Sequence, residues 1–251
     1  MSGETTRDSG SLAGRIAVVT GASGGIGRAI AVALSREGAR VCALGRNPIT
    51  LAETVAAARK YSHTIGFQVD LTLEEDLQTL LQHLEEAGSL DILIHCAGIV
   101  HQDVMEHARI QDLDMQYFTN VRAPYLLTQR LLPLLTAARG QIVFINSSVG
   151  LGAKRPDIGQ YAATKHALKA IAESLREEAN PKGVRVLSTY LGRTATPMQE
   201  ALFLTEGKPY CPETLLQPED VAATVVHALM LPPTAEVTDI SIRPMRKIEA
   251  Y

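Results

Sequence analysis

The sequence predicts an α/β fold built on a doubly wound parallel sheet of about seven strands, with helices on both faces. Short runs rich in Val, Ile and Leu alternate along the chain with longer segments of helical periodicity. A glycine-rich loop joins the first such run to the first helical segment. The chain has 251 residues with no repeat and no low-complexity linker, so we expect a single domain over 1–251.

The expected strands are short apolar runs, and several of the helices between them have marked ends. Pro48 is typical of a helix start, whereas Gly38 and Gly88 are typical of helix ends. Right-handed crossovers between parallel strands favour the doubly wound arrangement. The strands are expected at 15–20, 40–45, 63–70, 90–98, 140–148, 183–190 and 237–243. The helices are expected at 27–38, 48–61, 73–88, 111–137, from Tyr161 onward and at 218–230.

Composition excludes several classes of protein. The net charge is −3, so neither nucleic acid nor an anionic membrane is an expected partner. The three cysteines, Cys42, Cys96 and Cys211, lie far apart, which favours neither a disulfide framework nor a metal site. Residues 1–11 are expected to form a polar tail, without the apolar segment of a signal peptide. We therefore expect a cytoplasmic protein.

The glycine-rich loop "TGASGGIG" points to a bound dinucleotide. Gly21 permits the tight turn, Gly25 lets the backbone approach a pyrophosphate, and Gly27 allows helix and strand to pack closely. The N-terminus of the following helix offers free N–H groups and a partial positive charge to phosphates. An ordinary turn is the alternative, and the position after the first strand disfavours it. The loop residues expected to contact the cofactor are Gly21, Ser23, Gly25, Ile26 and Gly27.

The end of the second strand predicts which nicotinamide cofactor is bound. A site that selects NAD usually carries an acid there, on the ribose 2′-hydroxyl. This chain instead has Gly45 and Arg46, and a guanidinium can bind a 2′-phosphate, so NADP(H) is expected rather than NAD(H). A solvated Arg46 is the alternative. Asp70 and Leu71 follow the third strand and are expected near the adenine, although Asp70 could equally cap the next helix.

Four polar residues form a candidate catalytic group. Tyr161 and Lys165 are four residues apart and share one face of a helix. Ser148 ends the fifth strand, thirteen residues before Tyr161, at the sheet edge where ligands of open α/β sheets bind. Asn120 lies in the preceding helix. Because a free tyrosine has a pKa near 10, a cation such as Lys165 is needed to lower it toward neutrality.

Together these residues resemble the short-chain dehydrogenase/reductase family in its shorter form, on a Rossmann-type fold. The resemblance runs from about Leu12 to Arg243. It is carried by "TGASGGIG", Asp70, "CAG" at 96–98, Asn120, Ser148, Tyr161 and Lys165, in that order.

The resemblance implies that Ser148, Tyr161, Lys165 and Asn120 form an active-site tetrad. Tyr161 would give a proton to a carbonyl oxygen held by Ser148, while NADPH supplies the hydride. Lys165 would also bind the nicotinamide ribose, and Asn120 would hold a water. Ala97, Gly98 and Thr194 are the further cofactor contacts it implies. It also implies a homo-oligomer, a tetramer or a dimer, in which the 111–137 and Tyr161 helices pack against another subunit; Leu126, Leu127 and Leu131 could instead face the protein's own sheet.

Three positions depart from the family pattern. The usual "NNAG" reads "HCAG", and we interpret His95 as a structural residue at a strand end. The usual Pro-Gly after the sixth strand is Leu191-Gly192. Gly24 stands where users of NADP often carry a basic residue, so Arg46 would act alone.

The substrate side is less defined. Residues 195–216 are expected to form a substrate lid, in which apolar side chains either close over an apolar substrate or pack on the surface. Lys154 and Arg155 could meet an anionic group, but solvated charges are favoured. The expected function is NADP-dependent interconversion of a small carbonyl compound and its alcohol. A protein that senses NADP(H) without catalysis is the alternative; a sugar-nucleotide epimerase is disfavoured by the spacing of the glycines and by the lack of a longer C-terminal substrate domain.

Overall fold

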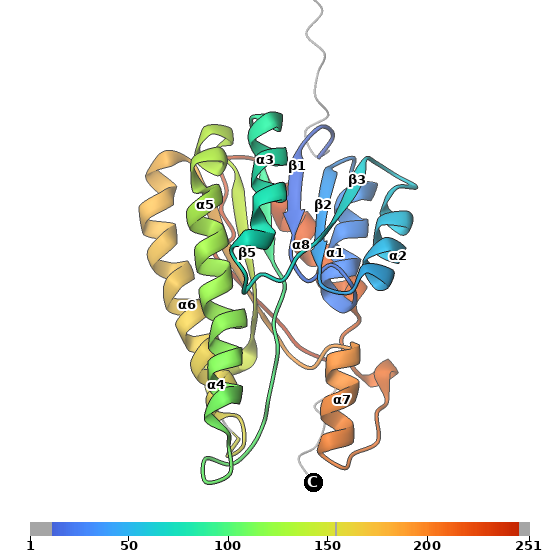
Figure 1. Ribbon diagram of the computed structural model, residues 1–251, viewed down its shortest axis with the longest axis vertical. Coiled ribbons are helices and arrows are strands. Elements are labelled where there is room, and N and C mark those ends of the chain that lie inside the picture. The colour runs from blue at the N-terminus through green and yellow to red at the C-terminus, as the bar shows by residue number, and fades with distance from the viewer. Residues whose placement is uncertain (1–11, 154, 246–251) are drawn as a thin grey trace, which may run out of the picture.

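The computed structural model describes residues 12–153 and 155–245, which form one seven-stranded parallel sheet (Figure 1). The predicted tail at 1–11 and Lys154 lie outside the described residues. The strand order is β3-β2-β1-β4-β5-β6-β7, with all neighbours parallel, which confirms the predicted fold class. The strands are β1 (Ile16–Val19), β2 (Arg40–Gly45), β3 (Thr64–Gln68), β4 (Ile92–His95), β5 (Gln141–Ser147), β6 (Arg185–Leu191) and β7 (Asp239–Ile242).

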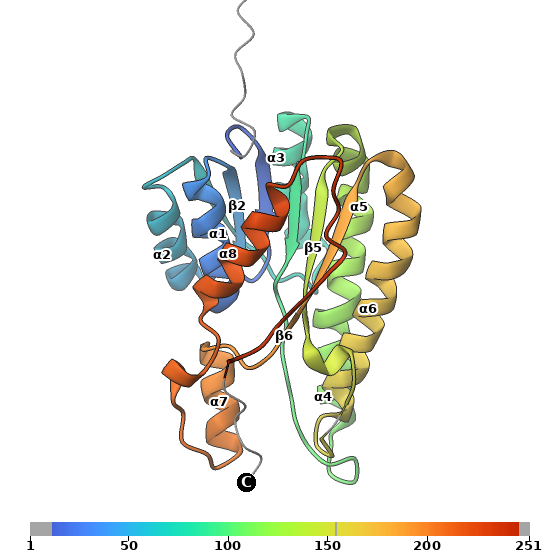
Figure 2. The ribbon, with the colours of Figure 1, turned by 180° about the vertical axis from the view of Figure 1, so that it is seen from behind.

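Helices cover both faces of this sheet, and each covered face has its own apolar core. Leu34 and Val225 pack on one face, while Leu131 and Phe144 pack on the other. The first face carries α1 (Gly25–Arg36), α2 (Pro48–Ala58) and α8 (Pro218–Leu229), seen in Figure 2. The second face carries α3 (Gln78–Ala87), α5 (Ala123–Ala138) and α6 (Gly159–Ala179), seen in Figure 1. Within the described residues, no helix is long and apolar enough to cross a membrane.

The predicted helix boundaries rest on local chemistry that the structure confirms. Pro48 is the first residue of α2, and the Asn47 side chain caps it by accepting from the N–H of Ile49 at 3.0 Å. Gly38 and Gly88 follow α1 and α3 with φ of 86° and 72°, in the left-handed region that glycine adopts without strain. Each strand also lies within its predicted range, except that β6 extends one residue further, to Leu191.

The helix predicted over 111–137 is confirmed as one unbroken helical segment, but its middle is π-helical, which was not predicted. The segment is α4 (Ile110–Tyr117), a π-helical stretch (Phe118–Arg122) and then α5. A π-helical turn contains an extra residue, and such turns occur frequently at functional sites. Asn120 lies inside this stretch, at 1% exposure. The sequence pattern did not reveal the inserted residue because apolar periodicity continues through it.

The side of the sheet on which successive strands are added changes between β1 and β4. After β1 the chain adds β2 and β3 on one side, and it then returns to place β4 on the other side of β1. The crevice at the carboxyl ends of strands beside such a switch point is the usual ligand site of open α/β sheets. A short helix that the sequence did not predict, α7 (Pro197–Thr205), lies beyond this edge (Figure 1).

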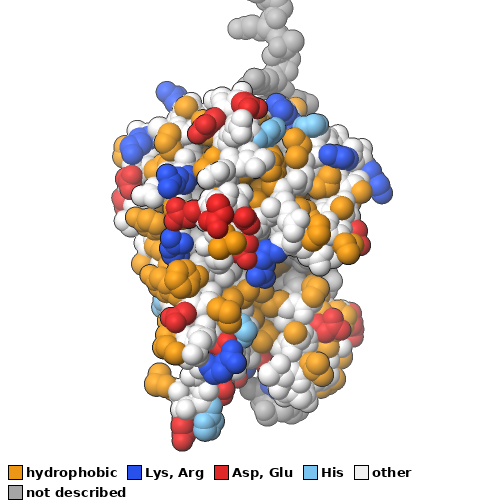
Figure 3. All heavy atoms as spheres, in the orientation of Figure 1, with side chains coloured by type: hydrophobic (Ala, Val, Ile, Leu, Met, Phe, Trp, Pro, Cys, Tyr) orange, Lys and Arg blue, Asp and Glu red, His pale blue; other side chains and the backbone are white. Residues whose placement is uncertain are grey.

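Aromatic side chains lie on the outer face of α4, the π-helical stretch and α5. Tyr117, Phe118 and Tyr125 are each about half exposed, and hydrophobic and charged side chains are interspersed over this part of the surface (Figure 3). Leu127 and Leu131, in contrast, are fully buried against the protein's own sheet, and Leu126 packs beside them. A partner subunit would therefore contact the aromatic face rather than these leucines.

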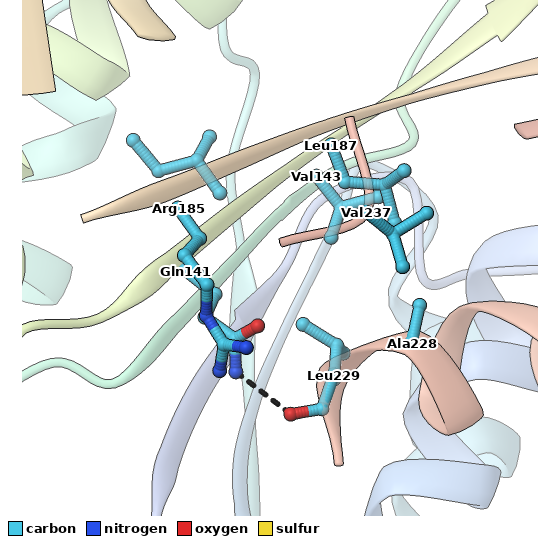
Figure 4. A pocket seen from close by; sticks show the side chains of 8 residues that line it. Gln141, Val143, Arg185, Leu187, Ala228, Leu229 and Val237 are labelled. Carbon is cyan, nitrogen blue, oxygen red and sulfur yellow. Dashed lines mark hydrogen bonds between the residues drawn. The ribbon is translucent and has the colours of Figure 1, made fainter. Parts of the chain in front are cut away.

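At the other end of the strands, where β5 and β6 begin, side chains bond to backbone carbonyls of the C-terminal part of the chain. The Gln141 side chain donates to the Leu229 carbonyl at 2.9 Å, and Arg185 donates to the Ala235 carbonyl at 2.7 Å. They border a cavity of about 10 Å³ between β5, β6 and α8 (Figure 4), which is the size of a single water. These two side chains fasten the end of α8 and the segment after it to the first residues of β5 and β6. The space between them is too small for a ligand.

We predict that the protein is a homo-oligomer, a dimer or a tetramer, through the aromatic face of α4 and α5. Light scattering at micromolar concentration is expected to give a multiple of 27.1 kDa. Tyr125→Glu places a charge in that face and is expected to reduce the measured mass, whereas Tyr61→Glu, at an exposed position beyond α2, is expected to leave it unchanged. A monomeric parent protein would contradict the prediction.

Candidate active site

The glycine loop holds its backbone in a conformation that other residues could not adopt. Gly21 has φ of 66°, and a Cβ there would lie 2.8 Å from Cα of Ala97. A Cβ on Gly27 would lie 2.3 Å from the carbonyl oxygen of Gly21, so only glycine lets α1 begin so close to the loop. Gly24 precedes α1 without a side-chain cap. The first N–H groups of α1 are therefore available to a phosphate.

Ser23 shows that the loop fits a polar ligand. Its Oγ is buried and has no hydrogen-bond partner among the described residues. A Cβ on Gly45 would lie 1.9 Å from this oxygen, so Gly45 is needed to make space for it at the end of β2. An unpartnered buried hydroxyl costs free energy, and the cost is removed when a ligand bonds to it. A dinucleotide on the loop would supply such a bond.

The structure brings Arg46 to this site, and Asp70 lies near Arg46: burial opposes the charge of Asp70, but bonds from Thr72 and the charge of Arg46 lower the pKa of this carboxyl. Arg46 is exposed directly after β2 and lines a cavity that begins at the glycine loop. Asp70 and Leu71 are not among the residues that line it. The Asp70 carboxylate accepts from both the N–H and the hydroxyl of Thr72, at 2.9 and 2.7 Å. It therefore closes a turn through one oxygen, Oδ1, and the contact of Asp70 and Leu71 with the adenine stays a prediction.

Tyr161 lies in the first turn of α6, where its phenol meets Ser147 rather than Ser148. Burial raises the pKa of the phenol to about 12, while the Ser147 hydroxyl beside it acts in the opposite direction. Ser147 is the last residue of β5 and is half-buried; Ser148 begins the following 3₁₀ turn and is exposed. Placing Ser148 beside Tyr161 was therefore wrong by one residue, because the connection from strand to helix is one residue longer than the assumed spacing.

Lys165 follows Tyr161 by one helical turn, and it is a buried cation. The side chain is 5% exposed, and its Nζ donates to the Ile145 carbonyl at 3.2 Å. Nζ also lies 5.7 Å from the centre of the Tyr161 ring. Burial lowers the pKa of Lys165 to about 8, so the amine is still mainly protonated at neutral pH. A Cβ on Gly98 would lie 3.9 Å from Nζ, which places Gly98 beside the amine.

Asn120 connects the loop after β4 to the helix of Tyr161 and Lys165. Its Oδ1 accepts from the N–H of Ile99 at 2.8 Å, and its Nδ2 donates to the Ile99 carbonyl at 2.9 Å and to the Thr164 hydroxyl at 3.1 Å. The side-chain amide is thus bonded at both ends to protein. Asn120 fixes the distance between the two segments that flank Lys165.

These residues meet in one cavity of about 920 Å³, which is large enough for a dinucleotide together with a small substrate. It extends from the glycine loop past Arg46 to Tyr161 and Lys165. Of the other sequence-predicted residues, the structure brings Gly21, Ser23, Gly25, Ile26, Gly27, Ala97, Gly98, Ser148 and Thr194 to the cavity wall. Asn120 lies behind the wall, and Asp70 and Leu71 are not among the residues that form it.

The lid segment, residues 195–216, closes one side of this cavity. Its two ends are joined, because Thr194 bridges Leu216 and the N–H of Ala195 donates to the Leu216 carbonyl at 2.7 Å. Met198 and Leu202 line the cavity, while Phe203 is buried at 4% exposure. The lid segment thus does both things that the sequence allowed: it packs on the protein and it presents apolar side chains to the cavity.

The departures from the family pattern are accommodated by packing. His95 is 4% exposed, bonds through Nε2 to the Thr128 hydroxyl at 2.8 Å and stacks on Phe144. Burial lowers the pKa of His95 to about 3, so it is neutral, which confirms the structural interpretation. Gly192 is tightly enclosed, since a Cβ there would lie 2.9 Å from Cδ of Pro244.

Comparison with known proteins gives the family. The model of the short-chain dehydrogenases matches residues 15–207. An uncharacterized oxidoreductase of Staphylococcus epidermidis is 31% identical over 92% of this chain and 97% of its own length. Glycine betaine reductase ATRR of Emericella nidulans is 32% identical over 94% of this chain, which spans only 19% of that protein.

Solved structures agree with that match. A dehydrogenase/reductase of Sinorhizobium meliloti has a TM-score of 0.81 and 30% identity, over 92% of this chain and 94% of its own. A short-chain dehydrogenase of Burkholderia cenocepacia, solved with NADP, has a TM-score of 0.80 and 28% identity, over 92% of this chain and 97% of its own. The chain belongs to the short-chain dehydrogenase/reductase family and is an NAD(P)-dependent enzyme acting on CH–OH groups.

We predict that Lys165→Met stabilises the protein at neutral pH while it abolishes activity. Burial has lowered the pKa of Lys165 from 10.5 to about 8, so holding it charged costs up to about 3 kcal/mol in the free energy of unfolding. Between pH 8 and 10.5 the unfolded chain binds the proton more tightly than the folded one, and the parent gains stability as the pH rises.

Urea denaturation at pH 7 and pH 9.5 measures this effect. The advantage of Lys165→Met over the parent is expected to shrink at the higher pH. Lys169→Met, one turn later, serves as the control, because Lys169 is only half-buried and pairs with Glu173. An advantage of equal size at both pH values, or a destabilised variant at pH 7, would argue against the buried charge.

Proposed function

We propose that the enzyme reduces the carbonyl group of a small molecule with NADPH and oxidises the corresponding alcohol in the reverse direction. The observation that carries this proposal is that the Tyr161 phenol has the Ser147 hydroxyl beside it, and that the buried Lys165 amine lies 5.7 Å from the Tyr161 ring centre, on the wall of the large cavity. A nicotinamide held beside Gly98 and Thr194 would supply or accept the hydride. The assignment of the residue roles below is part of the proposal.

Tyr161 is the proton donor in the direction of reduction. With a pKa of about 12 its phenol stays protonated across the physiological range, so the proton is present when the substrate binds. The oxygen of a carbonyl becomes a far stronger base than phenolate as hydride arrives, and the proton then moves downhill to it. The sequence predicts a phenol pKa lowered by Lys165, with the oxidised nicotinamide as a second cation. In the protein without cofactor, burial instead raises the pKa of this phenol, and the Ser147 hydroxyl opposes that rise only in part.

Ser147 acts on the oxygen that receives this proton, and Lys165 acts on the phenolate that loses it. The Ser147 hydroxyl can donate to the substrate oxygen and hold it near the phenol as negative charge develops. Lys165, charged below about pH 8, stabilises the phenolate that remains after transfer and can donate to a ribose hydroxyl. Asn120 keeps Lys165 in place through its bond to Thr164. Because the Asn120 side-chain amide is already bonded at both ends, a water held by Asn120 would bond to the main chain of Asn120.

The preference for NADP over NAD rests on Arg46. It is exposed at the end of β2 beside the cavity, where this strand carries no acid. Glu206, in the lid segment, is the one carboxylate among the described residues lining the cavity, and Asp70, whose pKa the Arg46 charge helps to lower, follows β3. A guanidinium there can bind a 2′-phosphate through two charge-assisted bonds. Relatives of this fold have been solved with NADP, among them the Burkholderia cenocepacia enzyme and Pseudomonas aeruginosa RhlG.

The assignment of Tyr161 and Ser147 can be tested with three variants assayed on a panel of ketones and aldehydes. Tyr161→Phe removes the proton and is expected to lower single-turnover rates by about two to four orders of magnitude with NADPH binding nearly intact. Ser147→Ala is expected to lower them by about one to three orders. Ser148→Ala is the matched control, and a larger loss for it than for Ser147→Ala would reverse the assignment.

Cofactor preference can be tested by titrating the protein with NADPH and NADH. Arg46→Asp is expected to weaken NADPH binding by about ten- to a hundredfold, because it replaces a charged donor by a repelling group, and to leave NADH binding unchanged or improved. Arg40→Asp, at the other end of the same strand, is the control. Equal loss for both cofactors, or none for either, would show that Arg46 does not read the 2′-phosphate.

A further inference from the structure

A cluster of charged side chains lies on the wall of the substrate cavity, where the lid segment meets the body of the protein. The carboxylate of Glu206 is at its centre, with its side chain 8% exposed. Arg193 donates to both of its oxygens at 2.8 Å, Arg155 donates to one at 2.9 Å, and Nζ of Lys208 lies 3.5 Å away. All four residues line the cavity.

The hydrogen-bond donors of the two arginines are used to different extents. All three nitrogens of Arg155 have acceptors, since it also donates to Asp157 at 2.7 and 3.1 Å and lies 3.5 Å from the Gln102 side chain. Arg193 bonds to Glu206 through Nη2 only, and its buried Nη1 has no partner among the described residues. Its guanidinium is held over the Phe203 ring, 4.6 Å from the ring centre. A fixed guanidinium with a free buried donor is suited to a second acceptor.

The cluster also carries more positive than negative charge. Three cations, Arg155, Arg193 and Lys208, surround the two carboxylates of Glu206 and Asp157. Burial opposes the charge on Glu206, but hydrogen bonds from Arg193 and Arg155 lower the pKa of this carboxyl, so it is ionised. Of the described residues that line the whole cavity, five are cations and Glu206 is the one acid. Such a cavity attracts an anion.

We propose that the substrate carries a carboxylate, which this cluster binds, so that the enzyme interconverts a keto acid and a hydroxy acid. Glu206 is then the internal counter-ion that the substrate carboxylate joins or replaces on Arg193 and Lys208. This inference rests on the proposed reductase function, because it names the substrate class of the same site.

The test compares methyl ketones that end in a carboxylate, at three chain lengths, with their methyl esters. With NADPH at low salt, at least one acid is expected to exceed its ester in kcat/KM by about tenfold or more, the effect of a charge-assisted bond. The ratio is expected to fall as salt is added, since the attraction is electrostatic.

Three variants identify the cluster as the cause. Arg193→Met removes the fixed donor and is expected to bring the ratio of acid to ester toward one. Glu206→Gln removes the competing carboxylate and is expected to raise that ratio. Arg109→Met removes an exposed arginine that pairs with Asp112 outside the cavity, and the ratio is expected to stay at the parent value.

Calorimetric titration of each acid and ester into the protein saturated with NADP⁺ tests the carboxylate site separately from the reductase function. Tighter binding of an acid, lost in Arg193→Met, supports the carboxylate site even if no ketone is reduced, and in that case the reductase function itself is wrong. Equal or weaker binding of the acids, including no binding of either compound, overturns the carboxylate site. The cluster would then only tie the lid segment to the body of the protein.

Discussion

A protonated amine held out of water is the constraint on which the active site depends. Lys165 is nearly fully buried, and burial lowers its pKa to about 8. The surroundings compensate only in part, through one bond to the Ile145 carbonyl. A group that costs stability persists when function requires it. The end of β5, the glycine at position 98 and the first turn of α6 are each arranged around this amine.

The same burial explains the state of the phenol. Taking Tyr161 out of water raises its pKa to about 12, which keeps its proton in place until a stronger base forms beside it. The two shifts are opposite in sign because burial disfavours the charged form of each group, phenolate in one and ammonium in the other. At neutral pH the phenol is therefore uncharged and the amine is still mainly charged, and a charge that develops on the substrate or on a bound cofactor acts on both groups with little screening by water.

Most of the fold could be predicted from the sequence because it rests on local signals. Apolar runs defined the strands, and Gly88 and Pro48 marked helix ends where the backbone requires them. The π-helical stretch around Asn120 could not be predicted, since its extra residue leaves the apolar pattern unbroken. Helix α7 was also missed, because Thr196 caps it within a segment that has little helical periodicity.

Some residues of the site could not be predicted from the sequence, because their positions depend on the exact length of a loop and on local hydrogen bonds. Ser148 was chosen by counting from Tyr161, but β5 ends with Ser147 facing the phenol, and counting cannot detect one additional residue in a loop. The contact of Asp70 with the adenine stays a prediction, and the bonds from Thr72 to its Oδ1 are local ones that the sequence analysis did not consider. The cluster around Glu206 joins residues 51 positions apart, and only the folded chain brings them together.

The measurement that tests the buried pair most directly is the titration of Tyr161 by ultraviolet difference spectroscopy between the parent and Tyr161→Phe. In the protein without cofactor, the parent is expected to show no additional phenolate up to about pH 10.5, because the pKa lies near 12. On saturation with NADP⁺ the additional ionisation is expected to appear at lower pH, since a second positive charge then favours phenolate. Ionisation of Tyr161 at the ordinary value near 10, both with and without NADP⁺, would contradict the coupling of burial and charge at this site.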